Sequence, residues 1–288
     1  MKIIDKPLIK DYTTYKLSGK IDKIIIPENI EELKKEINGE YKILGSGSNL
    51  IISETYKGKL IKLDNFDKLE IEGNIVKVGA GYLLPKLAHL LANKNLSGLE
   101  FACSIPGTIG GAIYMNAGAH GREMKDIVKT ITILDENKKI KTLSREDIEF
   151  KYRDSILKHK KYICLEVELI LENKDKDDII KTMKKYIGER RKKQPTEPSA
   201  GSVFKNGDYS SGKLIDEAGL KGYKIKGAKV SEKHANFIIN TGSASAEDII
   251  KLIDTIKEKI KEKYNIELEC EQEILKGWKV WRRKKREK

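Results

Sequence analysis

The chain has 288 residues, of which 39% are hydrophobic, enough for one large domain or for two to three smaller domains with cores of their own. The net charge of +13 invites a nucleic-acid interpretation, but lysines alternate with glutamates along the whole chain, which is typical of solvated helix faces. An odd number of widely spaced cysteines, no N-terminal apolar signal region and no run of eighteen apolar residues exclude a disulfide framework and a membrane span, and we expect a cytoplasmic protein.

The first elements in the chain predict a small βαβ unit. Residues 23–27 have the pattern of a strand, Asn29 and Glu32 form a predicted capping box for a helix with apolar residues on one face, and residues 42–44 predict the next strand. The carboxyl end of a strand is where α/β sheets bind ligands. A glycine-rich loop follows at that end, formed by Gly45, Ser46, Gly47, Ser48 and Asn49.

The middle of the chain predicts a second α+β unit with a second glycine-rich loop. Residues 60–63 and 74–81 are strand-like, residues 83–95 have helical spacing, and residues 126–172 hold several β-rich runs. The second loop contains Ser104, Pro106, Gly107, Thr108, Gly110, Gly111 and Ala112.

Two such loops in one chain suggest a bound dinucleotide. A backbone without Cβ atoms can approach a pyrophosphate closely and direct N–H groups at its oxygens, although either loop taken singly is more typical of a tight turn. The first loop lacks the GxGxxG spacing and leads into a strand-like run instead of a helix, and Gly-Lys pairs are followed by Ile or Leu instead of Ser or Thr. A nicotinamide-binding Rossmann fold and a P-loop are therefore disfavoured.

The last third predicts a further unit. A helix around residues 179–187 leads into a charged linker with two prolines at 189–198, followed by a short helix at 214–218, a strand at 236–240 and a helix capped by Ser245. The basic run at 282–288 is interpreted as a frayed tail, with contact to an acidic partner or a membrane surface as the alternative.

Five motifs in order resemble one family. They are GSGSN at 45–49, SIPGTIGGA at 104–112 with NAGA at 116–119, YRDS at 152–155 and GSVFKN at 201–206, and over about residues 15–275 the chain resembles UDP-N-acetylenolpyruvoylglucosamine reductase. The resemblance implies an α+β fold of the vanillyl-alcohol-oxidase type, with FAD between two α+β subdomains and a C-terminal α+β substrate domain. We expect the boundaries at residues 1–63, 64–195 and 196–288.

The resemblance also implies the reaction. NADPH would reduce a non-covalently bound FAD, and the reduced flavin would then reduce the enolpyruvyl group of a UDP-sugar to give UDP-N-acetylmuramate for peptidoglycan synthesis. Hydride reaches the β-carbon while negative charge builds up at the α-carbon and its carboxylate, which the protein must stabilise and protonate. We expect a monomer that binds no nucleic acid. We also expect no metal ion, since the four histidines show no metal-ligand spacing: His89, His120, His159 and His234.

The motif match assigns three catalytic roles. Ser202 corresponds to the family's proton donor, Arg153 to the arginine that stabilises the carboxylate, and Glu271 to the glutamate that orients the intermediate or relays a proton. In a strand, Glu269 and Glu273 would share the face of Glu271, so periodicity alone does not choose among them. Relatives commonly have arginine at the position of Glu273, which leaves the contribution of that arginine in doubt here.

The same match assigns binding residues. Besides the two loops, Asn116, Ala117 and Gly118 are expected to bind FAD, and Tyr152, Lys205 and Asn206 to bind substrate. Arg190, Arg191 and Lys193 could meet the UDP diphosphate, or could be a solvated linker. Cys103 is expected to be a packing residue rather than a point of flavin attachment.

Two other functions stay open at this stage. One is another FAD-dependent oxidoreductase of the same fold with a different small-molecule substrate. The other is a basic RNA-binding module, which is disfavoured because no aromatic stacking motif interleaves the lysines.

Overall fold

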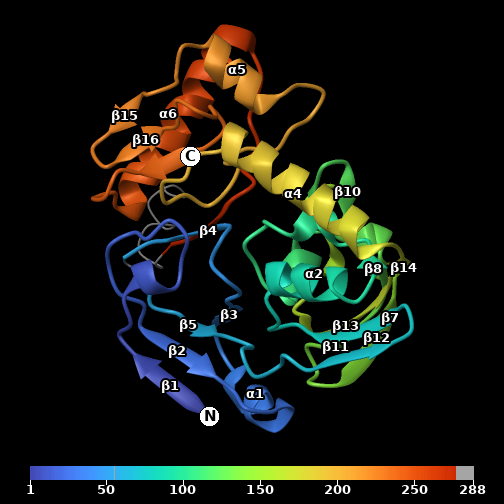
Figure 1. The fold of residues 1–288 in the computed structure, drawn as a ribbon. Helices are drawn as coiled ribbons and strands as arrows, with labels where there is room; N and C mark the ends of the chain where they lie inside the picture. The colour runs from blue at the N-terminus through green and yellow to red at the C-terminus, as the bar shows by residue number, and fades with distance from the viewer. Residues whose placement is uncertain (55, 277–288) are drawn as a thin grey trace. The chain divides into compact units, whose positions relative to one another are not determined.

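The computed structural model describes residues 1–54 and 56–276, and its chain divides into two compact units that do not follow the sequence order (Figure 1). The first unit comprises Met1–Ile3, Ile25–Ser46 and Leu60–Arg190. The second comprises Ile4–Ile24, Gly47–Lys59 and the chain from Arg191 onward. The predicted tail at 282–288 lies outside the described residues, and the three-domain division stays a prediction.

A four-stranded sheet of order β1-β2-β5-β3 holds the predicted βαβ elements. Its strands are β1 (Lys2–Asp5), β2 (Lys23–Ile26), β3 (Tyr41–Ile43) and β5 (Lys59–Ile61), and α1 spans Ile30–Glu36. The side chain of Asn29 caps α1 by accepting a hydrogen bond from the Glu32 backbone N–H, as predicted. The Glu32 carboxylate accepts from Glu28 N and not from the cap residue itself, so the reciprocal half of the capping box is shifted by one residue.

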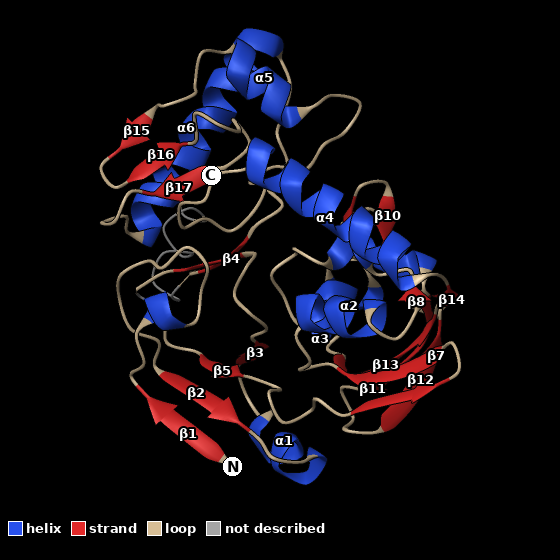
Figure 2. Ribbon diagram, in the orientation of Figure 1, coloured by secondary structure: helices blue, strands red, loops and turns tan. Residues whose placement is uncertain are grey.

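A five-stranded antiparallel sheet of order β12-β11-β13-β7-β6 forms the centre of the first unit. Its strands are β6 (Leu69–Glu72), β7 (Ile75–Gly79), β11 (Val128–Leu134), β12 (Ile140–Ser144) and β13 (Ile163–Ile170). Helices α2 (Leu84–Ala92) and α3 (Ile109–Tyr114) lie on one side of this sheet (Figure 2). Leu84, Leu87 and Leu91 of α2 are fully buried, because leucines at this spacing share one helix face.

Short elements complete the first unit. Two small antiparallel pairs join β8 (Leu96–Ser97) to β14 (Glu172–Asn173) and β9 (Gly118–Ala119) to β10 (Arg122–Glu123). Single 3₁₀ turns of this unit include Glu100–Ala102, Met124–Asp126 and Ile156–Lys158, whereas the turn Ile9–Asp11 belongs to the second unit.

The second unit contains a three-stranded sheet and two helices. The sheet has the order β15 (Lys224–Ile225), β16 (Ala228–Val230), β17 (Ile238–Asn240), and the helices are α5 (Ser211–Glu217) and α6 (Ala246–Tyr264). A parallel pair joins β4 (Leu50–Ile52) to β18 (Glu273–Leu275). Ser245 caps α6, as predicted, and forms a full capping box with Asp248. The predicted apolar face of α6 is buried.

Two expectations from the sequence were wrong. Helix α4 (Lys176–Lys193) continues through most of the charged stretch that was interpreted as a linker, because Glu, Arg and Lys are good helix formers and the chain reaches a proline only at Pro195. Residues 268–274 are not one regular strand. Cys270 makes a single bridge to Phe204, the chain bends at Gln272, and β18 begins at Glu273.

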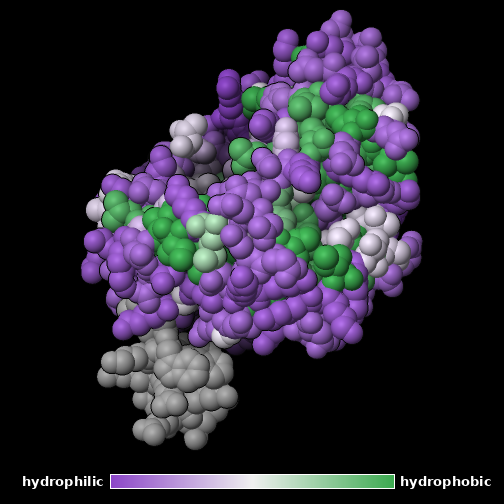
Figure 3. Space-filling view, turned by 90° about the horizontal axis from the view of Figure 1, so that it is seen from below, coloured by the Kyte–Doolittle hydropathy of each residue, from purple (hydrophilic) through white to green (hydrophobic). Residues whose placement is uncertain are grey.

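The face of the molecule drawn in Figure 3 is largely hydrophilic, with separate apolar areas among the polar residues. In residues 1–54 and 56–276, no helix combines the length and the apolar character that crossing a membrane requires.

Candidate active site

The first glycine loop is held by the protein's own packing. A Cβ atom on Gly45 would lie 2.8 Å from Thr108 Oγ1, which belongs to the second loop, so the two loops approach each other at this point. Gly47 has a φ of +63°, and a Cβ there would lie 2.2 Å from the carbonyl oxygen of Tyr12. Both positions therefore require glycine for reasons internal to the fold. Ser46 and Ser48 are half-buried.

The second glycine loop leads into helix α3. Thr108 is the N-cap, with its hydroxyl oxygen accepting from Gly111 N at 3.3 Å. Backbone hydrogen bonds fix the loop, from Ile109 N to Tyr82 O at 2.9 Å and from Gly110 N to Ala80 O at 2.8 Å. A Cβ on Gly110 would lie 3.0 Å from the Cβ of Ala80 and 3.2 Å from its carbonyl oxygen, so this glycine is needed for helix–strand packing. Ala112 is buried.

Gly107 is different from these glycines. Within the described residues, a Cβ there would meet no atom within 4 Å, and Gly107 is not among the residues with positive φ. Gly111 is similar, because its nearest neighbour, Thr108 Oγ1, would lie at an ordinary contact distance of 3.5 Å. Neither packing nor backbone conformation requires glycine at 107. A backbone that is open in this way leaves room for a ligand such as a pyrophosphate, so the loop fits FAD.

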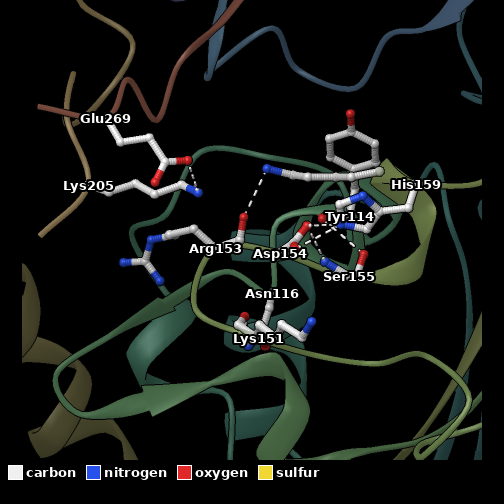
Figure 4. Close-up of polar contacts among 10 residues, drawn as sticks. Tyr114, Asn116, Lys151, Arg153, Asp154, Ser155, His159, Lys205 and Glu269 are labelled. Atoms are coloured by element: carbon white, nitrogen blue, oxygen red, sulfur yellow. Dashed lines mark hydrogen bonds and ion pairs between the residues drawn. The ribbon is translucent and has the colours of Figure 1, made fainter. Parts of the chain in front are cut away.

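Arg153 occupies the tip of a tight hairpin in the first unit (Figure 4). Its φ is +55°, its Nη2 donates to Gly118 O at 2.9 Å, and its guanidinium lies 4.9 Å from the centre of the Tyr152 ring. The structure thus joins the YRDS motif to the NAGA motif. The Tyr152 ring itself is 43% exposed and could contact a ligand.

Asn116 links the NAGA motif to Lys151, the residue directly before the YRDS motif. It is fully buried, its Nδ2 donates to Glu123 Oε2 at 3.0 Å and to Lys151 O at 2.9 Å, and its Oδ1 accepts from Lys125 N at 3.0 Å. Its side chain therefore serves the fold, so that any contact of Asn116 with the cofactor would come from its backbone. Ala117 and Gly118 follow it, half-buried.

Asp154 stabilises the hairpin that carries Arg153. Its carboxylate lies 2.9 Å from His159 Nε2 and accepts a hydrogen bond from Ser155 N at 3.0 Å (Figure 4). Burial acts to raise the pKa of Asp154, but the hydrogen bonds from His159 and Ser155 outweigh it and the pKa is lowered. Lys158 Nζ donates to Arg153 O at 2.9 Å and further fixes the tip.

Ser202 and Glu271 lie on neighbouring segments of the second unit. Glu271 N donates to Val203 O at 2.8 Å, and Phe204 and Cys270 form an antiparallel bridge. The first glycine loop meets the same segment, since Asn49 Nδ2 donates to Glu271 O at 3.1 Å and Glu273 N donates to Asn49 O at 3.0 Å. Ser202 is half-buried, and no hydrogen bond of its hydroxyl group is found within the described residues. Arg153 belongs to the other unit.

The remaining predicted substrate residues have local partners. Lys205 Nζ forms an ion pair with Glu269 Oε1 at 2.6 Å, drawn as a dashed line in Figure 4. Asn206 Oδ1 accepts from Ser211 N at 3.0 Å. Glu269 is thus held in an ion pair with Lys205, and the choice of Glu271 rests on the motif match.

Other residues singled out in the sequence are placed as follows. Cys103 is buried in the core of the first unit, as expected for a packing residue, and burial raises the pKa of its thiol. Arg190 is half-buried in α4, while Arg191 and Lys193 are exposed. No group of His, Cys, Asp or Glu suited to hold a metal ion occurs in the described part of the chain.

Sequence reasoning missed two buried polar residues beside this site. Tyr15 and Gln272 are fully buried or nearly so, and they share a hydrogen bond of 3.0 Å. The sequence carried one signal for Gln272. In residues 268–274, where alternate positions would share a face of a strand, this glutamine stands on the same face as Cys270 and Ile274.

Comparison with known proteins gives consistent matches along the chain. The protein-family model of an FAD binding domain matches residues 21–144. The family model of the UDP-N-acetylenolpyruvoylglucosamine reductase C-terminal domain matches residues 194–275. The UDP-N-acetylenolpyruvoylglucosamine reductase of Bacillus subtilis is 44% identical over 287 residues, covering 96% of this chain and 95% of the relative. That of Alkaliphilus oremlandii is 44% identical over 285 residues, covering 95% of this chain and 93% of the relative.

A solved structure agrees with these sequences. The crystal structure of UDP-N-acetylenolpyruvylglucosamine reductase from Thermus caldophilus superposes with a TM-score of 0.85 at 35% identity, covering 96% of this chain and all of that chain. The expected α+β fold with an FAD binding domain is thereby confirmed. By identity along nearly its whole length and by its fold, this chain belongs to the UDP-N-acetylenolpyruvoylglucosamine reductase family.

Proposed function

We propose that Ser202, Arg153 and Glu271 perform the chemistry of this chain, which is an FAD-dependent reductase that uses NADPH to convert UDP-N-acetylenolpyruvoylglucosamine to UDP-N-acetylmuramate. The substrate gains a hydride at the β-carbon and a proton at the α-carbon, so that its carbon–carbon double bond becomes single, while NADPH becomes NADP⁺. Bound FAD supplies the redox chemistry by accepting the hydride from NADPH and passing it on. The protein must hold the cofactor, stabilise charge on the substrate and deliver the proton.

Gly107 is the observation that best supports the cofactor role of the second loop. Its open surroundings leave the backbone accessible, whereas Gly45, Gly47 and Gly110 set the shape of the two loops from within. We assign FAD binding to these loops together with the stretch from Asn116 to Gly118.

Arg153 is proposed to stabilise the negative charge that builds up on the substrate carboxylate. A guanidinium keeps its charge and presents a planar set of donors, which suits a carboxylate that becomes enediolate-like. A non-glycine residue at a φ of +55° is strained, and such a conformation persists only where its surroundings fix it. The hydrogen bond to Gly118 O and the contact with Tyr152 provide that fixation.

Ser202 is proposed to give the proton to the α-carbon. A positioned general acid contributes roughly 10²–10⁴-fold to the rate of such a step. A serine hydroxyl is a weak acid, and Glu271, whose backbone is bonded to Val203 next to it, is the carboxylate that we assign to orienting the intermediate or relaying the proton. Lys205 and Asn206, on the same segment, are proposed to contact the nucleotide sugar.

The cellular context follows from the proposed reactants. Both NADPH and a UDP-sugar are cytoplasmic metabolites in bacteria, and we propose that the enzyme works there. We further propose that it acts as a monomer and without nucleic acid.

The experiment that tests this proposal separates the two half-reactions of the Ser202→Ala variant by following flavin absorbance in a stopped-flow instrument. Reduction of bound FAD by NADPH should stay close to wild type, while reoxidation by the enolpyruvyl sugar should slow by roughly 10²-fold or more. Ser245→Ala is the matched control, because it also removes a serine hydroxyl group in the second unit, from the N-cap of α6.

Two outcomes would contradict the proposal. Equal losses in both half-reactions would remove Ser202 from the role of proton donor. Reoxidation of the wild-type flavin by oxygen alone, with the enolpyruvyl sugar inert, would mean a different substrate.

A further inference from the structure

Gln272 is a buried amide that joins three segments of the second unit. Only 4% of it is exposed, and Tyr15, 257 positions away in the chain, is fully buried. Tyr15 OH donates to Gln272 Oε1 at 3.0 Å, and Gln272 Nε2 donates to Ala200 O at 3.0 Å and to Gly201 O at 3.2 Å. None of the catalytic roles assigned above uses this network.

The chemistry of the partners fixes the direction of every hydrogen bond. Carbonyl oxygens only accept, so the amide nitrogen of Gln272 must face Ala200 and Gly201. The amide oxygen then faces Tyr15, whose hydroxyl must donate. Burial raises the pKa of Tyr15, so the phenol stays protonated and remains a donor. Both N–H groups of the amide are used, and a buried network that is satisfied in this way holds a single arrangement.

The network acts on the peptide directly before Ser202. The carbonyl of Gly201 belongs to the peptide bond whose nitrogen is that of Ser202, and Gly201 has a φ of +73°, which glycine adopts without strain but also leaves easily. In the register set by the bridge between Phe204 and Cys270, Gln272 lies opposite Ser202. Gln272 also directly follows Glu271 in the chain.

We propose that Gln272 and Tyr15 are positioning residues that hold the Gly201–Ser202 peptide, and with it the Ser202 hydroxyl, in register with Glu271 for proton delivery. This inference rests on the proposed role of Ser202. The amide of Gln272 does not touch substrate or cofactor in this role. It acts by restricting the backbone at Gly201, directly before Ser202, while the hydrogen bond from Glu271 N to Val203 O restricts the backbone directly after Ser202.

The first test is the Gln272→Leu variant of the full-length FAD-loaded enzyme. Leucine has a similar size but cannot bind the two carbonyls, so the serine would lose its fixed position. A misplacement of a catalytic group by about 1 Å costs on the order of 10²-fold in rate. We expect reoxidation of the reduced flavin by the enolpyruvyl sugar to slow by about 10- to 100-fold, with the rate of FAD reduction by NADPH and the flavin spectrum unchanged. The Ser245→Ala variant controls for loss of stability in the same unit.

The second test is the pH profile of the Gln272→Glu variant. An ionised carboxylate would repel the two carbonyls, whereas a protonated carboxyl group can donate to one of them and still accept from Tyr15. Burial among carbonyls raises the pKa of such a carboxyl group above its ordinary value of about 4.3. We therefore expect the reoxidation rate to be low at high pH and to recover as the pH falls through the raised pKa. Wild type and Gln272→Leu should lack this recovery. A merely structural role of Gln272 would not produce the recovery in Gln272→Glu either.

Tyr15→Phe is a milder variant that keeps the proposal testable even if Gln272→Leu fails to fold. It removes only the donor to the amide oxygen, and we expect a loss of about 2- to 10-fold in reoxidation, since this corresponds to a single neutral hydrogen bond. In the Gln272→Leu background the same change should add little, because the phenol has already lost its partner.

The outcomes separate this inference from the proposed function. Normal reoxidation in Ser202→Ala would overturn the role of Ser202 and the inference with it. Slow reoxidation in Ser202→Ala together with wild-type reoxidation in Gln272→Leu or Tyr15→Phe would overturn the positioning role alone. A pH profile of Gln272→Glu that matches wild type would also overturn it.

Discussion

Replacement of Gly107 by alanine separates a demand of the ligand from a demand of the fold. A Cβ at 107 would meet no atom of residues 1–54 or 56–276 within 4 Å, and the backbone there does not have a positive φ. The protein without FAD should therefore tolerate the methyl group. It should even gain about 0.4–1 kcal/mol in free energy of unfolding, because alanine restricts the unfolded chain more than glycine does.

The cofactor should not tolerate the same methyl group. If a pyrophosphate lies against the backbone of Gly107, an added methyl creates overpacking that typically costs about 1–3 kcal/mol. Converted at 1.4 kcal/mol per tenfold change, the Kd for FAD should rise by about 5- to 150-fold. Gly110→Ala is the matched comparison, since its Cβ would lie 3.0 Å from the Cβ of Ala80 and 3.2 Å from the backbone oxygen of the same residue. That variant should lose stability with or without FAD.

The assay uses FAD-free protein for both variants. Thermal unfolding without ligand gives the stability, and titration with FAD, followed by flavin fluorescence, gives the Kd. The expected pattern is an unchanged or higher Tm with a weaker Kd for Gly107→Ala, and a lower Tm for Gly110→Ala. Wild-type FAD affinity in Gly107→Ala would refute the reasoning, because the space beside Gly107 would then not be the place of the cofactor.

Two further predictions concern charged residues. Arg153→Lys should keep bound FAD but lower turnover by at least about tenfold, because a lysine lacks the planar donors that reach Gly118 O and stack on Tyr152; a steady-state rate equal to wild type would remove Arg153 from the site. The pKa of Asp135 is lowered by the hydrogen bond from Lys141 and by backbone N–H groups, so its carboxylate stabilises the fold above the unfolded pKa of about 3.9 and loses this effect as the pH falls through the lower folded value. Asp135→Asn should therefore lower the Tm at neutral pH and approach the wild-type Tm in acid, and a Tm difference that does not vary with pH would contradict this.

The local signals in the sequence predicted local structure well. Helix α6 begins at its Ser245 cap and buries its apolar face, and Asn29 caps α1, because a cap and a helical period involve residues only three or four positions apart. The charged stretch that ends α4 was wrongly interpreted as a linker, because that interpretation also used only local features. Charge and two nearby prolines are local features, and the helix stops only when it reaches the first proline.

The motifs by themselves determined the family, the cofactor and the reaction, since their order along the chain is a property of the sequence. Only the tertiary structure decided which of these glycines the fold itself requires. Gly45 is required by Thr108 and Gly47 by Tyr12, whereas nothing in the described part of the chain requires glycine at 107. It also decided that the Asn116 side chain serves the fold and that Gln272 is bonded to Tyr15. These facts depend on contacts between residues tens to hundreds of positions apart, and periodicity and spacing carry no information about which distant segments fold against each other.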